Sequence, residues 1–363
     1  MKKLRILTIA LAAAVCGISA FAQTTQKLTA TKINEYGLIY ALPLTRVNVT
    51  FEATKTVRQP GEFFRYSKKY LGIDPITEPS VDYQLTGATL TSEGFADQDE
   101  RYLVQFKSGS TPFMIVDQND FPVAVNTEKS YEPLQPKLPK AVDAAPTILE
   151  TPVAAQAVTA EMQQSPSSAK RAELAAARIF ELRQSRSEII SGTAENMPSD
   201  GTAMQLALDN LAQQEAALTA MFVGTTQTST EVGTYSFTPN AADNQVQTVI
   251  ARLSPSSGLV DADDLSGRPI TLTVKVTERG TLPKNEKGET KRFPKGGYAY
   301  RIPGTAQFSV TFDGNEVASE SLPVAQLGVV FGLDPNIFTD KKAPAYAVMN
   351  PVTGAVVEIG VVK

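Results

Sequence analysis

Carboxylates are the side chains with the clearest catalytic potential in this 363-residue sequence, because imidazole and thiol groups are nearly absent. The chain contains no His, and its one Cys, Cys16, lies in a segment that we expect to be removed. A chain without His and Cys cannot build a Ser-His-Asp triad, a Cys-His dyad or a His/Cys zinc site. Its 38 Asp and Glu residues could still supply the paired carboxylates of a glycoside hydrolase, about 5 to 9.5 Å apart. No pair is singled out by its spacing and Trp is absent, so the sequence predicts no catalytic residue and no cofactor.

One acidic stretch resembles the start of a calcium-binding loop. Asp261, Asp263 and Asp264 place oxygen ligands close together. An EF-hand loop also needs a third alternating ligand and a bidentate Glu at position 12. Leu265 and Leu272 occupy those two positions here. The stretch therefore indicates an acidic loop in water, and we predict no metal site.

The charge of the chain argues against polyanionic partners. Its net charge is -4, and removal of the first 22 residues, which contain three cations, makes it more negative. Such a chain has no overall electrostatic attraction to nucleic acid or to anionic membrane surfaces. The mixed charges of residues 284–292 indicate a hairpin tip in water, with contact to an acidic partner as the alternative.

Four tyrosines form the candidate binding surface. Tyr36, Tyr40, Tyr66 and Tyr70 fall within 35 residues of one another. Tyr suits binding surfaces because its ring is apolar and its hydroxyl is polar. Packing of the same rings in the core is the alternative.

Residues 1–22 have the pattern of a secretory signal peptide. Three cations precede an apolar run over residues 6–21, and Ala20 and Ala22 give the small-x-small pattern before a cleavage site. A retained anchor needs about 20 apolar residues, more than this run provides. Lipidation at Cys16 is a further alternative, although Val15 is a poor residue before such a cysteine. We expect an exported chain in the periplasm, at the outer membrane or outside the cell, with no transmembrane segment after cleavage.

The remaining sequence predicts a mainly β fold with an α-helical hairpin. Alternating apolar residues over 47–53 predict a half-buried strand, and short runs rich in β-branched and aromatic residues recur towards both ends of the chain. We expect two β-sandwich-like or open-barrel regions that flank the hairpin or join around it. The predicted division is a signal peptide (1–22), an N-terminal β region (23–131), a Pro/Ala-rich connector (132–168), a helical hairpin (169–224) and a C-terminal β region (225–363).

The two predicted helices carry charged residues close to their apolar stripes. If the hairpin closes symmetrically about residue 196, Arg183 lies level with Asp209, and Arg178 lies level with Glu215. Arg186 would join these ion pairs or contact a backbone carbonyl of the β regions. We interpret the charges as structural ion pairs that fix the helix packing; an ionic site is the alternative.

Several segments in this order resemble a family of exported proteins of uncharacterised function from Gram-negative anaerobes. The resemblance covers nearly the whole chain after the leader. It implies a cell-envelope location and brings no catalytic residue with it. The segments that carry it are residues 36–43, 60–63, 70–72, 179–183, 200–201, 214–220 and 351–354.

Taken together, these patterns predict a non-enzymatic exported binding or scaffolding protein. Its partner would be another envelope protein or a surface glycan, held by shape-complementary contact or by strand addition at an open sheet edge. A carboxylate-based glycan hydrolase is the alternative function, and a dimer formed through the helical hairpin is a third possibility.

Overall fold

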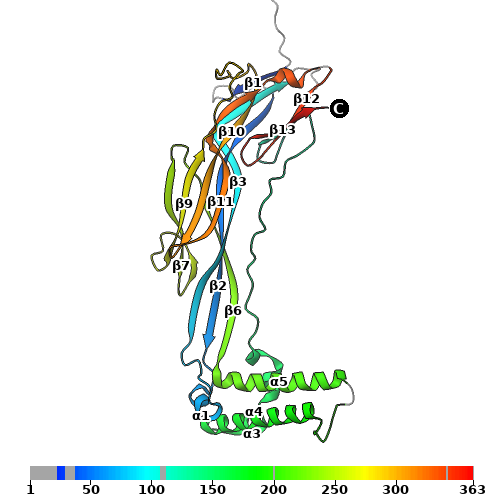
Figure 1. Ribbon diagram of the computed structural model, residues 1–363, viewed down its shortest axis with the longest axis vertical. Helices are drawn as coiled ribbons and strands as arrows, with labels where there is room; N and C mark the ends of the chain where they lie inside the picture. Colours follow the sequence, from blue (N-terminus) through cyan, green and yellow to red (C-terminus); the bar gives the residue numbers. More distant parts are fainter. Residues whose placement is uncertain (1–22, 29–36, 107–111, 199–200, 341, 363) are drawn as a thin grey trace, which may run out of the picture.

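The computed structural model describes residues 23–28, 37–106, 112–198, 201–340 and 342–362. Figure 1 shows an elongated molecule in which long strands run along the axis and helices cross it at one end. The fold is mainly β with a helical hairpin, as the sequence predicts. The leader segment 1–22 lies outside the described residues.

The first sheet is a long twisted ribbon with the strand order β1-β3-β2-β6. The strands β2 and β3 pair antiparallel over nearly the whole of β2, with two register shifts. A short helical turn, η1 (Phe64–Tyr66), and α1 (Ser67–Leu71) join them at the far end. The strands are β1 (Gln23–Lys27), β2 (Leu38–Gln59), β3 (Ser80–Phe106) and β6 (Thr225–Phe237).

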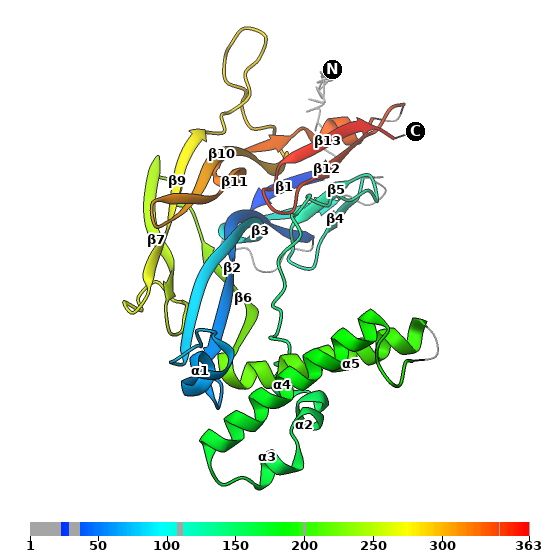
Figure 2. The same ribbon diagram turned by 60° about the horizontal axis from the view of Figure 1, so that its bottom comes forward.

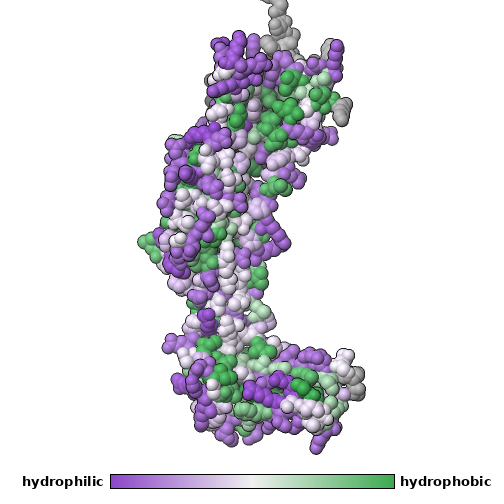
Figure 3. All heavy atoms as spheres, viewed as in Figure 1, coloured by the Kyte–Doolittle hydropathy of each residue, from purple (hydrophilic) through white to green (hydrophobic). Residues whose placement is uncertain are grey.

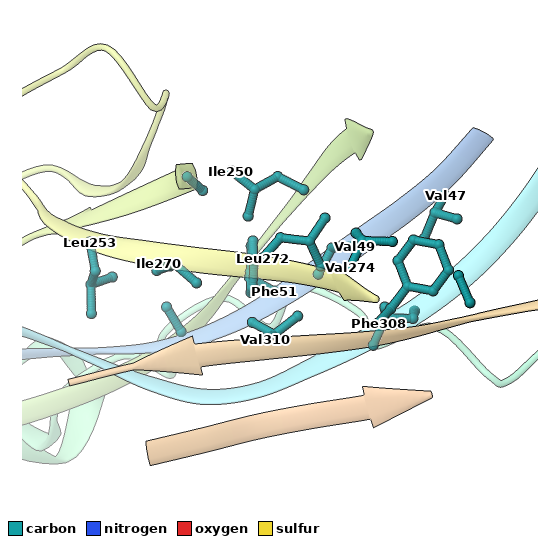
Figure 4. Close-up of a cluster of buried hydrophobic side chains, with 14 of the residues drawn as sticks. Val47, Val49, Phe51, Ile250, Leu253, Ile270, Leu272, Val274, Phe308 and Val310 are labelled. Carbon is teal, nitrogen blue, oxygen red and sulfur yellow. The ribbon is translucent and has the colours of Figure 1, made fainter. Parts of the chain in front are cut away.

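The second sheet packs on the first and closes the main core. Inward residues of β2 (Val47, Val49 and Phe51) meet those of the second sheet, including Leu272 and Phe308, as Figure 4 shows. All five side chains are fully buried, which follows from the period of two in each strand. The strand order is β11 (Asn315–Leu333), β10 (Tyr298–Phe312), β9 (Arg268–Glu278), β7 (Gln245–Ser254) and β8 (Gly258–Val260).

The third sheet covers the upper ends of the long strands and encloses a second core. Tyr40, Tyr298 and Phe338 are its largest fully buried side chains. The short helix η3 (Pro335–Phe338) leads into this sheet. Its strand order is β13 (Val356–Val361), β12 (Ala345–Met349), β5 (Pro122–Val125) and β4 (Met114–Val116).

The N-terminal and C-terminal β regions share two of the three sheets. The strand β6 pairs with β2 along thirteen residues, and β12 pairs with β5. The sequence left open whether these regions are separate, because strand pairing over such long separations leaves no local pattern. In the structure they pair directly with each other and form one body, and the hairpin lies at one end of it.

The helical hairpin forms a foot at one end of this body (Figure 2). Ser167 caps the first long helix, and Gly192, with a φ of 73°, ends it. Ile179, Leu182, Leu218 and Phe222 are buried in a third core between the helices and η1. The helices are η2 (Ile148–Glu150), α2 (Pro152–Ala157), α3 (Ala160–Gln164), α4 (Ser168–Ser191) and α5 (Gly201–Val223). In the described part of the chain, no helix is long and apolar enough to span a bilayer.

The Pro-rich connector is extended only in its first half. Residues 127–146 run along the outside of the body from the third sheet to the foot (Figure 1). Within the connector, Val142 makes a single antiparallel bridge to Thr230 on β6. The following residues form η2 and α2, since Thr147 and Glu150 make a capping box and Pro152 occupies the first turn of α2.

Candidate docking edge

The four candidate tyrosines do not lie on one surface. Tyr36 lies outside the described residues, and Tyr40 is completely buried and stacks on Tyr102 with ring centroids 5.5 Å apart. The Tyr40 hydroxyl accepts a hydrogen bond from the Ala299 backbone N–H at 2.8 Å, and burial raises its pKa. Tyr40 therefore joins the first sheet to β10.

The other two candidate tyrosines lie at the opposite end of the molecule, on the foot. Tyr66 and Tyr70 are half-buried with ring centroids 6.3 Å apart, and both pack against the third core. They therefore take part in the packing of η1 and α1 against the long helices.

The ion pairs of the hairpin follow a different register from the predicted one. Glu215, whose side chain is 14% exposed, binds Arg183 at 2.7 Å and Arg186 at 2.9 Å. Arg178 instead pairs with Glu181 on its own helix, and Asp209 accepts a hydrogen bond from the neighbouring Gln205 side chain. The predicted Arg178–Glu215 and Arg183–Asp209 pairs are wrong. The register is fixed by the apolar residues of the third core, not by the midpoint of the connecting loop.

The predicted acidic loop is a tight turn. The Asp264 carboxylate accepts a hydrogen bond from the Ser266 backbone N–H at 2.9 Å, and this bond lowers the pKa of Asp264. Among the residues that the structure describes, no group of three or more His, Cys, Asp and Glu side chains is placed to hold a metal ion.

Three larger cavities of the molecule differ in whether a carboxylate lines them. Glu215 lines a groove of about 410 Å³ on the foot, whereas no carboxylate lines a cavity of about 390 Å³ beside the start of β6 or one of about 430 Å³ beside β13. A glycoside hydrolase needs two carboxylates across one cleft. None of these three cavities offers that arrangement.

The free edge of β13 is the strongest candidate for a binding site. This strand ends the third sheet and pairs only with β12. The Val362 backbone N–H donates to the Pro344 carbonyl at 2.8 Å, so by alternation Gly360 and Glu358 also bond to β12. The N–H and C=O groups of Ile359 and Val361 consequently point away from β12. They are available to another strand.

The side chains along this edge are apolar as well as exposed. Val357, Ile359, Val361 and Val362 have exposed fractions of 44%, 55%, 55% and 41%. Ile359 and Val361 lie opposite Ala347 and Ala345, respectively, and so continue the inner face of the third sheet. Figure 3 shows hydrophobic residues gathered in the region where β12 and β13 lie in Figure 1. An added strand would extend the second core.

Other sheet edges in the described chain are protected against pairing with a further strand. The free end of β11 carries Glu316 and Glu320, and β6 is crossed by the connector at Thr230. The edge strands β1, β4 and β8 have only five, three and three residues. Charges, covering segments and short length are the usual protection of sheet edges. The edge of β13 carries only one charge, that of Glu358.

The outer face of β13 is held by a small polar cluster. Lys129 binds Glu358 at 2.8 Å and the Tyr346 hydroxyl at 3.0 Å, and that hydroxyl also donates to Glu358. The hydrogen bond from Lys129 is the main cause of the lowered pKa of Glu358. Gly360 lies beneath the Tyr346 ring, because a Cβ there would come within 2.6 Å of it. The cluster fixes the strand in place beside the 430 Å³ cavity.

The edge and the sheets behind it define a mainly β protein in which one sheet ends in an open edge strand. The chain belongs to the family of the domain of unknown function DUF4831, whose sequence pattern matches residues 36–357. Neither a curated protein nor a solved structure matches the chain. The family match stops within β13, so Ile359 and Val361 lie just beyond it.

None of the site residues predicted from the sequence lies on β13. The sequence did contain a sign of an unusual strand. Apolar residues occupy both even-numbered and odd-numbered positions from Val356 to Val362, interrupted only by Glu358 and Gly360. A strand with one face in water would alternate apolar and polar residues. The order of the strands, and not the local sequence, leaves the backbone groups of Ile359 and Val361 pointing away from the sheet at its edge.

Proposed function

We propose that this chain is a non-enzymatic binding or scaffolding protein of the cell envelope that holds another envelope protein by strand addition at β13. The observation that carries the proposal is the free edge of β13, with its outward backbone groups and exposed Val357, Ile359 and Val361. Export is supported by the leader pattern of residues 1–22 and by the family resemblance. The partner would be an extended segment with apolar residues at alternate positions.

Strand addition is energetically reasonable at this edge. Complete burial of a Val or Ile side chain stabilises a complex by about 1.5–3 kcal/mol, so three half-exposed side chains contribute roughly 3 kcal/mol. Each backbone hydrogen bond adds about 0.5–1.5 kcal/mol. A glycan would satisfy the backbone groups but would leave these apolar side chains without partners. Together with the lack of paired carboxylates in the three cavities above, this favours a protein partner over hydrolysis or glycan binding.

The sharpest test removes one backbone N–H that points away from the sheet and keeps the hydrogen bonds between β13 and β12. Ile359→Pro removes a donor that faces away from the sheet, and proline is tolerated at free edges. A photo-crosslinking amino acid at position 357, introduced into the protein in intact cells, should give one discrete protein adduct. We expect Ile359→Pro to abolish this adduct and Ile359→Ala, which keeps the N–H, to weaken it.

The control places the same crosslinker at position 190 on the foot, where Ile190 is 69% exposed. It should not capture the same partner. An adduct that survives Ile359→Pro, an adduct with a second copy of the chain, or an absence of any adduct would each contradict strand addition to an envelope protein. Circular dichroism of Ile359→Pro checks that the fold is intact.

A further inference from the structure

The loop between β9 and β10 is an ordered hairpin. The Asn285 side-chain oxygen accepts hydrogen bonds from the backbone N–H groups of Lys287 and Glu289, at 3.0 and 2.9 Å. The Asn285 backbone N–H donates to the Glu289 carbonyl at 2.8 Å, and Lys284 forms a bridge with Thr290. The backbone at the tip of this hairpin, which is defined here as residues 281–295, is therefore held in place by its own hydrogen bonds. Figure 2 shows it projecting away from the sheets beyond β9 and β10.

The hairpin is cationic, although the chain as a whole is anionic. It has five cations and two carboxylates in fifteen residues, while the net charge of the chain is -4. All seven charged residues are exposed, and one carboxylate, that of Glu289, is held by the Asn285 amide at 2.9 Å. In the described chain, no salt bridge involves Lys284, Lys287, Lys291 or Arg292. The five cations are Lys284, Lys287, Lys291, Arg292 and Lys295.

Exposed apolar side chains stand beside these cations. Phe293 is 46% exposed, and its ring rests edge-on against Phe331 with centroids 6.2 Å apart. It also lies over Gly332, where a Cβ would come within 2.8 Å of the ring. Leu282 is 38% exposed. Phe293 thus keeps a fixed, half-exposed position beside Arg292.

We propose that this hairpin docks on an anionic lipid surface, with its cations at the lipid phosphates and Phe293 at the boundary of the acyl chains. Cations that flank an exposed aromatic ring are the combination that binds the headgroup region of a bilayer. An acidic protein would match the charges but would not require the exposed ring. The net negative charge does not oppose docking, because charges more than about 8 Å away are screened at physiological salt. The inference does not use the edge of β13.

Vesicle sedimentation tests this proposal with the chain purified after export. We expect binding to vesicles of phosphatidylglycerol mixed with phosphatidylcholine, and no binding to phosphatidylcholine alone. Neutralising four cations (K284Q, K287Q, K291Q and R292Q) should lower the partition coefficient at least a hundredfold. The matched control makes the same change in net charge on the foot (R65Q, K68Q, K69Q and K170Q) and should leave binding nearly unchanged.

A second pair of variants tests the apolar contribution. Phe293→Ser should weaken vesicle binding about tenfold, whereas Phe180→Ser, at a residue 52% exposed on α4, should not weaken it. Soluble glycerol phosphate at the same phosphate concentration should not displace the protein from vesicles. Equal loss in the two fourfold variants, equal binding to both kinds of vesicle, no binding to either, or displacement by glycerol phosphate would overturn the proposal.

Discussion

The buried ion pair between Arg301 and Asp97 offers the most decisive test of how the sheets are held together. Arg301 on β10 and Asp97 on β3 have side-chain exposures of 7% and 14%, and their charged groups are in direct contact. The Arg301 backbone N–H also donates to the Gly354 carbonyl at 2.9 Å. The pair therefore lies at the junction between the first and second sheets, where water cannot replace either partner.

Removing only the carboxylate should be far more costly than removing the pair. Asp97→Ala leaves the Arg301 charge buried without a partner, which lowers the free energy of unfolding by about 3–5 kcal/mol. The double variant Asp97→Ala with Arg301→Met removes both charges and should lie within about 1–2 kcal/mol of the original chain. The exposed pair of Arg268 and Asp313 provides the control, and Asp313→Ala should cost about 1 kcal/mol or less.

The assay is urea unfolding monitored by circular dichroism. The slope m, which is the dependence of the unfolding free energy on urea concentration, is compared between variants to check that the same amount of surface is exposed on unfolding. The double-mutant cycle gives the coupling energy directly. If Asp97→Ala costs no more than Asp313→Ala, or if the double variant is as unstable as Asp97→Ala, the burial argument for this pair is wrong.

Three further results are expected. Gly360→Val should displace the Tyr346 ring and loosen β13, seen as faster amide hydrogen exchange in that strand; unchanged exchange would contradict the packing of Gly360. The lowered pKa of Glu358 means that its contribution to stability is present above the pKa of the unfolded chain and is lost as the pH falls through the folded pKa. Carboxyl NMR titration should show this lowered pKa, and Lys129→Met should raise it. Glu215→Ala should cost only about 1 kcal/mol, because both of its arginine partners are partly exposed and can be hydrated; urea unfolding measures this, and a loss above 3 kcal/mol would refute it.

The sequence determined the features that depend on neighbouring residues. Alternation in β2 around Val49 predicted a buried strand face, and the apolar stripes within residues 169–224 predicted the helical hairpin of α4 and α5. The mainly β class with a helical hairpin follows from such local patterns, because side-chain period and capping act within a few residues. The mixed charges of residues 284–292 likewise indicated an exposed hairpin tip.

Only the tertiary structure decided which distant segments meet. The pairing of β6 with β2, the offset register that brings Glu215 to Arg183, and the burial of Tyr40 all join residues far apart in the sequence. The place of β13 at the open end of the third sheet, which leaves the outward backbone groups of Ile359 without a partner strand, likewise depends on the order of the strands. Strand order is set by the burial of apolar faces across the whole molecule, and no local pattern records which strand is left at an edge.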